Sequence, residues 1–267
     1  MSKVADYDLV DELGTGNHGE YWLARPPGRL ELEPDALVVV KVLSTHHSEN
    51  DFMRMANELR VYAAIDSEHL VPIIDAGQQA GRLFYASPFF PDGSLETPVV
   101  PLSEATVVQA VADAAAACHR LHDAGIAHRD IRPSKVLLKE SRGHLNDLGL
   151  AQMLDPGQRA TGHGPVGTSH FLATELVRGA TASRATDLWS FGATLHTAIS
   201  GKPLFQDIEG KDVLTVLRTI LHEAPTVDES IPTTIRPVIE RCLAAEPQDR
   251  YPTTIAFAEA LLESASL

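Results

Sequence analysis

Short hydrophobic runs, several of them with polar residues in alternation, fill most of the first 90 positions of the chain. Four of these runs are rich in β-branched and aromatic residues and are bounded by Gly, Pro or Asp, namely YDLVDEL, GEYWLAR, ALVVVKVL and RLFYAS. Such runs are typical of β-strands. Between residues 49 and 65 the period changes, because Phe52, Met55 and Leu59 recur at the spacing of one helix face. The pattern therefore predicts a small sheet interrupted by one helix.

Beyond residue 90 the hydrophobic positions follow helical spacing. Helices are expected from Ser103 to about Ala124 and near residues 183–200, 211–222, 232–244 and 252–264. The sequence thus predicts an α+β fold with two lobes. The first is a small antiparallel-sheet lobe with one helix, residues 1–90, and the second is a larger, mainly helical lobe, residues 91–267, with a hinge at about 86–94.

Composition narrows the class of protein. The formal net charge of -14 over 267 residues argues against a nucleic-acid-binding surface. Polar residues interrupt each apolar stretch before it reaches the roughly 20 residues of a membrane span, and the first residues lack the pattern of a secretory signal. We therefore expect a cytoplasmic protein without a membrane segment. Its two cysteines, Cys118 and Cys242, are expected to be reduced and buried.

Three glycines stand between the first two predicted strands. Gly14, Gly16 and Gly19 form G-x-G-x-x-G, and glycine lets a backbone approach a phosphate group because no Cβ intervenes. The same spacing occurs in ordinary tight turns and in dinucleotide sites. A dinucleotide site requires a helix directly after the glycines, whereas Glu20 to Ala24 has the pattern of a strand. The motif alone leaves the phosphate-binding and tight-turn interpretations open.

A lysine stands near the end of the third predicted strand, in VVVK. A buried ammonium group is costly unless it meets an anion. Lys41 therefore either contacts an anion or extends along the strand end to solvent. Glu58, in the one predicted helix of this lobe, is the expected anion if that helix packs on the sheet.

The second lobe contains AHRDIRPSKVLL, residues 127–138, in which His128, Arg129 and Asp130 precede a short loop and an apolar run typical of a strand. Further motifs follow in order, namely DLG at 147–149, ATE at 173–175, DLWSFG at 187–192 and PQDR with Arg250. Together with the glycine motif, VVVK and the helix glutamate, this ordered set resembles the eukaryotic-type Ser/Thr protein kinases over essentially the whole chain.

The resemblance implies an ATP-dependent enzyme that transfers the γ-phosphoryl group to Ser or Thr hydroxyls of a protein substrate. Lys41 would hold the α- and β-phosphates, and Glu58 would orient it. Asp147 would hold Mg²⁺, or Mn²⁺ in its place, and Asp130 would accept the proton of the attacking hydroxyl. Arg132 stands where the family has its catalytic-loop lysine, so positive charge is kept while the geometry changes.

The nucleotide site implied by the resemblance departs from the family at the hinge. The carbonyl of Phe89 would accept from adenine, but Pro91 lacks the N–H that the family usually donates to the purine. The residues expected to bind the nucleotide are Leu13, Gly14, Gly16, Gly19, Tyr21, Val39, Lys41, Phe89, Pro91, Lys135, Leu137 and Asp147.

The segment from 147 to 175 resembles the family's activation segment. Thr168 matches the threonine that Ser/Thr-directed members use beside the catalytic aspartate, which implies a Ser or Thr acceptor. Thr161 is a candidate phosphorylation site, with an unmodified flexible loop as the alternative. Glu175 is expected to pair with Arg250.

Lys135 stands where the family has the asparagine that binds a second metal ion. An ammonium group cannot ligate a cation, so weakened second-metal binding is expected. Either Lys135 supplies the missing positive charge in an active kinase, or the domain is a pseudokinase or nucleotide-binding module with little or no phosphotransfer. Asp130, Asp147 and the Lys41 and Glu58 pair favour activity. A small-molecule kinase shares the two-lobed plan, but the DLWSFG and ATE motifs speak against it.

Overall fold

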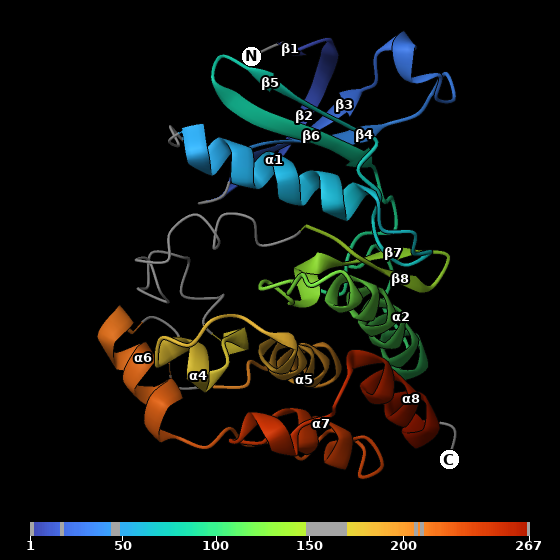
Figure 1. Ribbon diagram of the computed structural model, residues 1–267. Helices are drawn as coiled ribbons and strands as arrows, with labels where there is room; N and C mark the ends of the chain where they lie inside the picture. Colours follow the sequence, from blue (N-terminus) through green and yellow to red (C-terminus); the bar gives the residue numbers. More distant parts are fainter. Residues whose placement is uncertain are drawn as a thin grey trace. The chain divides into compact units, whose positions relative to one another are not determined.

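The computed structural model describes residues 3–16, 19–43, 49–147, 170–205, 208 and 211–265. The chain divides into two compact units, of which the first comprises Met1–Ile65 and Val71–Phe90 and the second Asp66–Leu70 and Pro91–Leu267 (Figure 1). The elements of the first unit are β1 (Lys3–Val4), β2 (Tyr7–Gly16), β3 (Gly19–Arg25), η1 (Gly28–Leu30), β4 (Val38–Val42), α1 (Glu49–Ala63), β5 (Asp75–Gln79) and β6 (Arg82–Pro88). Those of the second are α2 (Glu104–Asp123), η2 (Pro133–Lys135), β7 (Val136–Lys139), β8 (Arg142–Leu145), α4 (Thr174–Val177), α5 (Arg184–Ser200), α6 (Val213–His222), α7 (Arg236–Cys242), η5 (Pro247–Asp249) and α8 (Thr254–Ala265).

The first unit is built on a six-stranded antiparallel sheet in the order β1-β2-β3-β4-β6-β5, with α1 beside it (Figure 1). The four strands and the helix predicted from the hydrophobic pattern are confirmed. β5 was not predicted, because its sequence DAGQQ carries no alternating apolar face. It lies at the edge of the sheet and is largely exposed, so its backbone pairing with β6 does not depend on apolar side chains.

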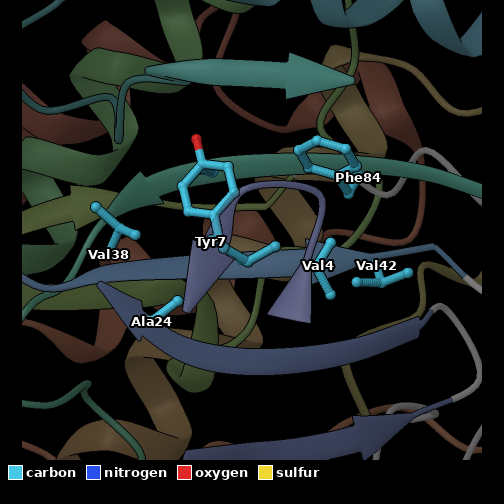
Figure 2. Packing of buried hydrophobic residues seen from close by; sticks show 8 residues of the cluster. Val4, Tyr7, Ala24, Val38, Val42 and Phe84 are labelled. Carbon is cyan, nitrogen blue, oxygen red and sulfur yellow. The ribbon is translucent and has the colours of Figure 1, made fainter. Parts of the chain in front are cut away.

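The hydrophobic core of this unit lies on one face of the sheet. Figure 2 shows the cluster, which consists of Val4, Tyr7, Ala24, Val38, Val40, Val42, Phe84 and Ala86. Alternate residues of β4 point into it because side chains alternate between the two faces of a strand. The Tyr7 and Phe84 rings pack edge to face with their centroids 6.0 Å apart. The Tyr7 hydroxyl donates to the Asp75 carboxylate at 2.6 Å, which ties the edge strand β5 to the core.

The second unit is mainly helical and is centred on the alanine-rich helix α2. This helix packs against α8, α5 and the β7–β8 hairpin (Figure 1). Ser103 caps its first turn by accepting from the Thr106 N–H. Gly143 of β8 lies so close to α2 that an added Cβ would stand 2.1 Å from the Ala110 carbonyl oxygen. The absence of a side chain at Gly143 therefore lets the β7–β8 hairpin, which follows Asp130 in the chain, lie close to the helix.

The predicted helices of the second unit are confirmed, with one boundary shifted. The helix expected over residues 232–244 begins at Arg236 and has Pro237 in its first turn, where a missing N–H is tolerated. Cys118 and Cys242 are free and buried, as predicted. Among the helices of the described residues, none combines the length and apolarity needed to cross a membrane.

Candidate active site

A buried ion cluster lies at the open end of the β7–β8 hairpin in the second unit. Val136 pairs with Leu145 in the hairpin, and the Asn146 N–H donates to the Lys135 carbonyl at 2.8 Å just outside it. This register brings Lys135 next to Asp147. The Lys135 ammonium donates to a carboxylate oxygen of Asp147.

Asp130 of the catalytic-loop motif lies in the same cluster. One of its carboxylate oxygens is 3.7 Å from the Lys135 Nζ and the other is 3.3 Å from the Arg132 Nε. The side chain of Asp147 is 3 % exposed, that of Lys135 9 % and that of Asp130 10 %. The buried carboxylate of Asp147 and the half-buried carboxylate of Asp130 thus share the buried ammonium group of Lys135, and such pairing is what permits burial of charge. The structure brings together four predicted site residues, namely Asp130, Arg132, Lys135 and Asp147.

Asp187, the first residue of the DLWSFG motif, fixes the backbone of the catalytic loop. Its side chain is 1 % exposed and accepts from the His128 N–H at 2.7 Å, from the Arg129 N–H at 2.9 Å and from the His122 Nε2 at 2.7 Å. The DLWSFG motif thus anchors the loop through Asp187. His122 was not predicted. The only signal for it in the sequence is its spacing of four residues from Cys118 on α2, and that thiol also contacts the Asp187 carboxylate at 3.8 Å.

His128 joins the loop of Asp130 to the segment that leads to Asp147. Its Nδ1 accepts from the Asp130 N–H at 3.4 Å, and its Nε2 lies 3.2 Å from the Asn146 carbonyl oxygen, to which it donates. These partners assign the neutral tautomer with the proton on Nε2. Burial lowers the pKa of His128, which keeps the ring neutral.

Asp147 of the ion cluster and Arg129, next to Asp130 in the chain, have left-handed backbone conformations. Arg129 has a φ of 74° and Asp147 a φ of 64°. This region costs a non-glycine residue of the order of 1 kcal/mol or more, and such strain persists only where the surroundings enforce it. The Asp187 carboxylate enforces it at Arg129 by accepting that residue's N–H. Strained positions of this kind concentrate at functional sites.

In the first unit, Lys41 is buried with 3 % of its surface exposed. The interpretation in which this lysine extends to solvent is therefore wrong. Its Nζ lies 4.9 Å from the ring centroid of Tyr21 and 5.8 Å from that of Tyr85, its cross-strand neighbours on β3 and β6. Glu58 lies on α1, but its side chain is outside the described residues, so its pairing with Lys41 stays a prediction.

The glycine motif forms the tip of the β2–β3 hairpin, where Gly16 pairs with Gly19. Gly19 has a φ of 136°, and an added Cβ would stand 2.2 Å from the Val42 carbonyl oxygen. Close packing of β3 on β4 therefore requires glycine at this position, whatever the hairpin binds. Gly14 has a φ of 156° and open space where a Cβ would be.

The other predicted nucleotide contacts are distributed over both units. Leu13 is 48 % exposed on β2, and Val39 is half-buried on β4. The Phe89 N–H donates to the Leu37 carbonyl at 3.2 Å. In the second unit Pro91 is exposed and Leu137 is half-buried on β7.

Of the predicted activation segment, the structure describes the C-terminal end. The Arg250 guanidinium, whose side chain is 0 % exposed, donates to both carboxylate oxygens of Glu175 at 2.6 and 3.0 Å. The predicted pair is confirmed. Its geometry is bidentate, which is the strong form of an arginine–carboxylate ion pair. Thr161 and Thr168 lie outside the described residues.

The chain matches the family model described as protein kinase domain over residues 7–263. The chain belongs to the protein kinase family. Among the curated relatives, it is 31% identical over 265 residues to the serine/threonine-protein kinase PknK of Mycobacterium tuberculosis, a match that covers 96% of this chain and 23% of that protein. It is also 31% identical over 263 residues to PkaA of Streptomyces coelicolor, covering 91% of this chain and 47% of that protein. The kinase chain thus spans about a quarter to a half of these relatives.

Solved structures agree with the kinase assignment. The chain superposes on the crystal structure of the Mycobacterium tuberculosis PknI kinase domain with a TM-score of 0.74, at 25% identity, covering 100% of this chain and 99% of that one. The predicted fold class, a kinase fold with a small antiparallel sheet and a larger helical part, is confirmed.

Proposed function

We propose that this domain transfers the γ-phosphoryl group of ATP to Ser or Thr hydroxyls of a protein substrate. The observation that carries the proposal is the convergence of Asp130 and Asp147 on one buried cation, Lys135, in a chain of the protein kinase family. The names of the relatives as serine/threonine-protein kinases support the choice of acceptor. Thr168 supports it too, because in the sequence it matches the threonine of the Ser/Thr-directed family members.

In the proposed reaction Asp130 accepts the proton of the attacking hydroxyl. Arg132 beside one carboxylate oxygen and Lys135 beside the other orient it for this task. Both cations also provide fixed positive charge for the phosphoryl oxygens as charge redistributes in the transition state. Phosphoryl transfer depends mainly on alignment and electrostatic stabilisation. The main contribution of this unit is therefore a loop whose backbone Asp187 and His128 fix, so that Asp130 is held in position.

The residues of the cluster fit one divalent cation. Asp147 presents a buried carboxylate oxygen toward a positive charge, which is the donor chemistry that Mg²⁺ and Mn²⁺ prefer. We therefore assign Asp147 as the metal ligand. Bound there, the ion would neutralise charge on the phosphate groups. Lys135 has no lone pair to offer a second ion, so the second-metal site of the family does not fit this chain.

The nucleotide contacts in the first unit are proposed from the family pattern. Lys41 would hold the α- and β-phosphates with Glu58 as its partner. Lys41 is buried with its ammonium group near two tyrosine rings, which supports a role in binding rather than in keeping the surface soluble. The glycine hairpin would cover the phosphates. Leu13, Tyr21, Val39 and Leu137 would contact adenine, together with the hinge residues Phe89 and Pro91. A cytoplasmic signalling role, with Thr161 as a phosphorylation site, belongs to the same proposal.

The test is transfer of labelled phosphate from ATP to peptides that contain Ser, Thr or Tyr, with Mg²⁺ or Mn²⁺. Native protein should label the Ser and Thr peptides. Asp130→Asn should reduce the rate by about 10²- to 10⁴-fold, the usual contribution of a general base. Asp123→Asn, which changes an exposed aspartate on α2, is the matched control and should retain the native rate. Labelling of the Tyr peptide alone would contradict the proposed acceptor.

A nucleotide-binding module without phosphotransfer is the second candidate, and the contact between the Lys135 ammonium and the Asp147 carboxylate is the observation that favours it. The same assay separates the two functions. Absence of labelling by native protein, together with its appearance in Lys135→Asn, would support the module and contradict the kinase.

A further inference from the structure

Lys135 occupies a position between the two carboxylates that the proposed reaction needs. Its ammonium donates to Asp147 and lies 3.7 Å from the Asp130 carboxylate. The backbone of Lys135 is also fixed, because its N–H donates to the Arg132 carbonyl at 2.9 Å and its carbonyl accepts from Asn146. The ammonium is therefore held in the cluster by the fold of the loop rather than by a chance surface contact.

The Lys135 ammonium reduces the need of Asp130 and Asp147 for a metal ion to balance their charge. Two carboxylates that are largely shielded from water and lie near each other repel unless positive charge lies between them. In this chain the fold itself supplies that charge. A divalent ion that approaches Asp147 meets a carboxylate that is already paired, and it meets the repulsion of the ammonium group as well.

We propose that Lys135 is a resident counter-cation that competes with the divalent ion for Asp147. In the metal-free domain its ammonium neutralises Asp130 and Asp147 together, and a divalent ion binds Asp147 only by displacing it. The displaced ammonium then takes the place of the second metal ion of the family beside the phosphates. The second part of this inference rests on the proposed binding of ATP, whereas the competition for Asp147 does not.

Three consequences distinguish this arrangement from a lysine that only fills space. Mn²⁺ binds the nucleotide-free domain weakly, because it must displace a paired cation. One Mn²⁺ rather than two accompanies each bound nucleotide. Nucleotide binding persists when divalent ions are removed, because the ammonium group remains to contact the phosphates.

The experiment compares native protein with Lys135→Met and Lys135→Asn. Methionine keeps the length of the side chain without its charge, and asparagine also adds the amide oxygen that the family uses as a ligand. Lys139→Asn is the matched control. Lys139 is an exposed lysine at the end of β7, the strand that directly follows Lys135, and its loss changes the net charge equally. Thermal unfolding of each variant without metal verifies that it is folded.

The first measurement is Mn²⁺ binding to the nucleotide-free proteins, followed by electron paramagnetic resonance. Both Lys135 variants should bind Mn²⁺ at least about tenfold more tightly than native protein, since a unit charge within about 4 Å is removed. The Lys139 variant should match native protein. Equal affinity in native protein and Lys135→Met, including undetectable binding in both, would overturn the competition.

The second measurement adds a non-hydrolysable ATP analogue. Native protein should bind one Mn²⁺ per analogue and Lys135→Asn two. The affinity for the analogue is then measured with a chelator in place of Mn²⁺. Native protein should bind the analogue at least about tenfold more tightly than Lys135→Met, because only native protein keeps the ammonium group. Two Mn²⁺ ions in native protein would overturn the replacement of the second metal. Failure of the analogue to bind any of the proteins would instead overturn the proposed function and leave the result for Asp147 standing.

Discussion

Asp187 and Asp147 are both buried aspartates of the second unit, and their charges are balanced in different ways. Asp187 accepts from two backbone N–H groups and a histidine ring. Asp147 accepts from a lysine side chain. Backbone donors cannot leave without distorting the chain, whereas a lysine side chain can rotate away. The comparison indicates that one carboxylate maintains the shape of the loop and the other is arranged to exchange its partner during function.

The largest expected effect is that of Asp187→Asn. Each hydrogen bond to a charged acceptor contributes about 1.5–3 kcal/mol, and the amide of asparagine turns an N–H toward donors that need an acceptor. The amide keeps one accepting oxygen, so up to two of the three hydrogen bonds are lost. We expect the free energy of unfolding to fall by about 3–6 kcal/mol, which urea denaturation followed by circular dichroism measures. A loss below about 1 kcal/mol would mean that the loop keeps its shape without this anchor.

Asp147→Asn should cost much less stability. It removes one partner of Lys135, but the ammonium still lies 3.7 Å from Asp130, and the neutral amide still accepts a hydrogen bond. We expect a loss of about 1–2 kcal/mol, together with loss of Mn²⁺ binding. Denaturation with and without Mn²⁺ measures both effects. If Asp147→Asn destabilises the domain as much as Asp187→Asn does, the distinction between a permanent and an exchangeable partner is wrong.

The neutral ring of His128 gives the loop a dependence on pH. Burial lowers the pKa of His128 in the folded protein below its ordinary value of 6.5, so the unfolded chain binds the proton first as the pH falls. Stability is therefore unaffected by this group above the unfolded pKa and decreases below it, by at most about 1.4 kcal/mol per pH unit, until the folded pKa is reached.

The variant His128→Asn tests this dependence. Urea denaturation between pH 7 and pH 5, an interval chosen about the ordinary histidine pKa of roughly 6.5, should give a shallower loss of stability in the variant than in native protein. His196, whose pKa burial also lowers, contributes the same slope to both proteins and cancels in the difference. Parallel curves would show that His128 is not the source of the loss.

The sequence was sufficient for the elements whose hydrophobic pattern matches their burial. The strand β4 and the helix α2 are examples. Val38, Val40 and Val42 form a buried apolar face on β4, and most of the buried residues of α2 are apolar. β5 and β8 were not predicted, because DAGQQ and RGHL pair through the backbone and carry few apolar side chains. Their position depends on neighbouring strands, which a local pattern does not include.

The candidate site also has features that the sequence predicted and features that it did not. The motifs singled out Asp130, Arg132, Lys135 and Asp147, and the structure brings these side chains together. The prediction that Lys135 does not bind a metal ion rests on the chemistry of an ammonium group. The contact of Lys135 with Asp147 was not predicted, because the expected partner was phosphate and the register of β7 with β8 decides the actual one. The donors to Asp187 were also missed, since they lie 58 to 65 residues away along the chain.

The smallest effect should come from an ion pair of similar geometry at the surface. Lys3 and Asp8 are 2.9 Å apart, but their side chains are 60 % and 59 % exposed. Water and salt screen such a pair, and ordering two side chains offsets most of the gain. Lys3→Ala should change the free energy of unfolding by less than about 0.5 kcal/mol, and added salt should abolish the difference between variant and native protein in urea denaturation. A loss comparable to that of Asp147→Asn would show that distance rather than burial determines the strength of ion pairs in this domain.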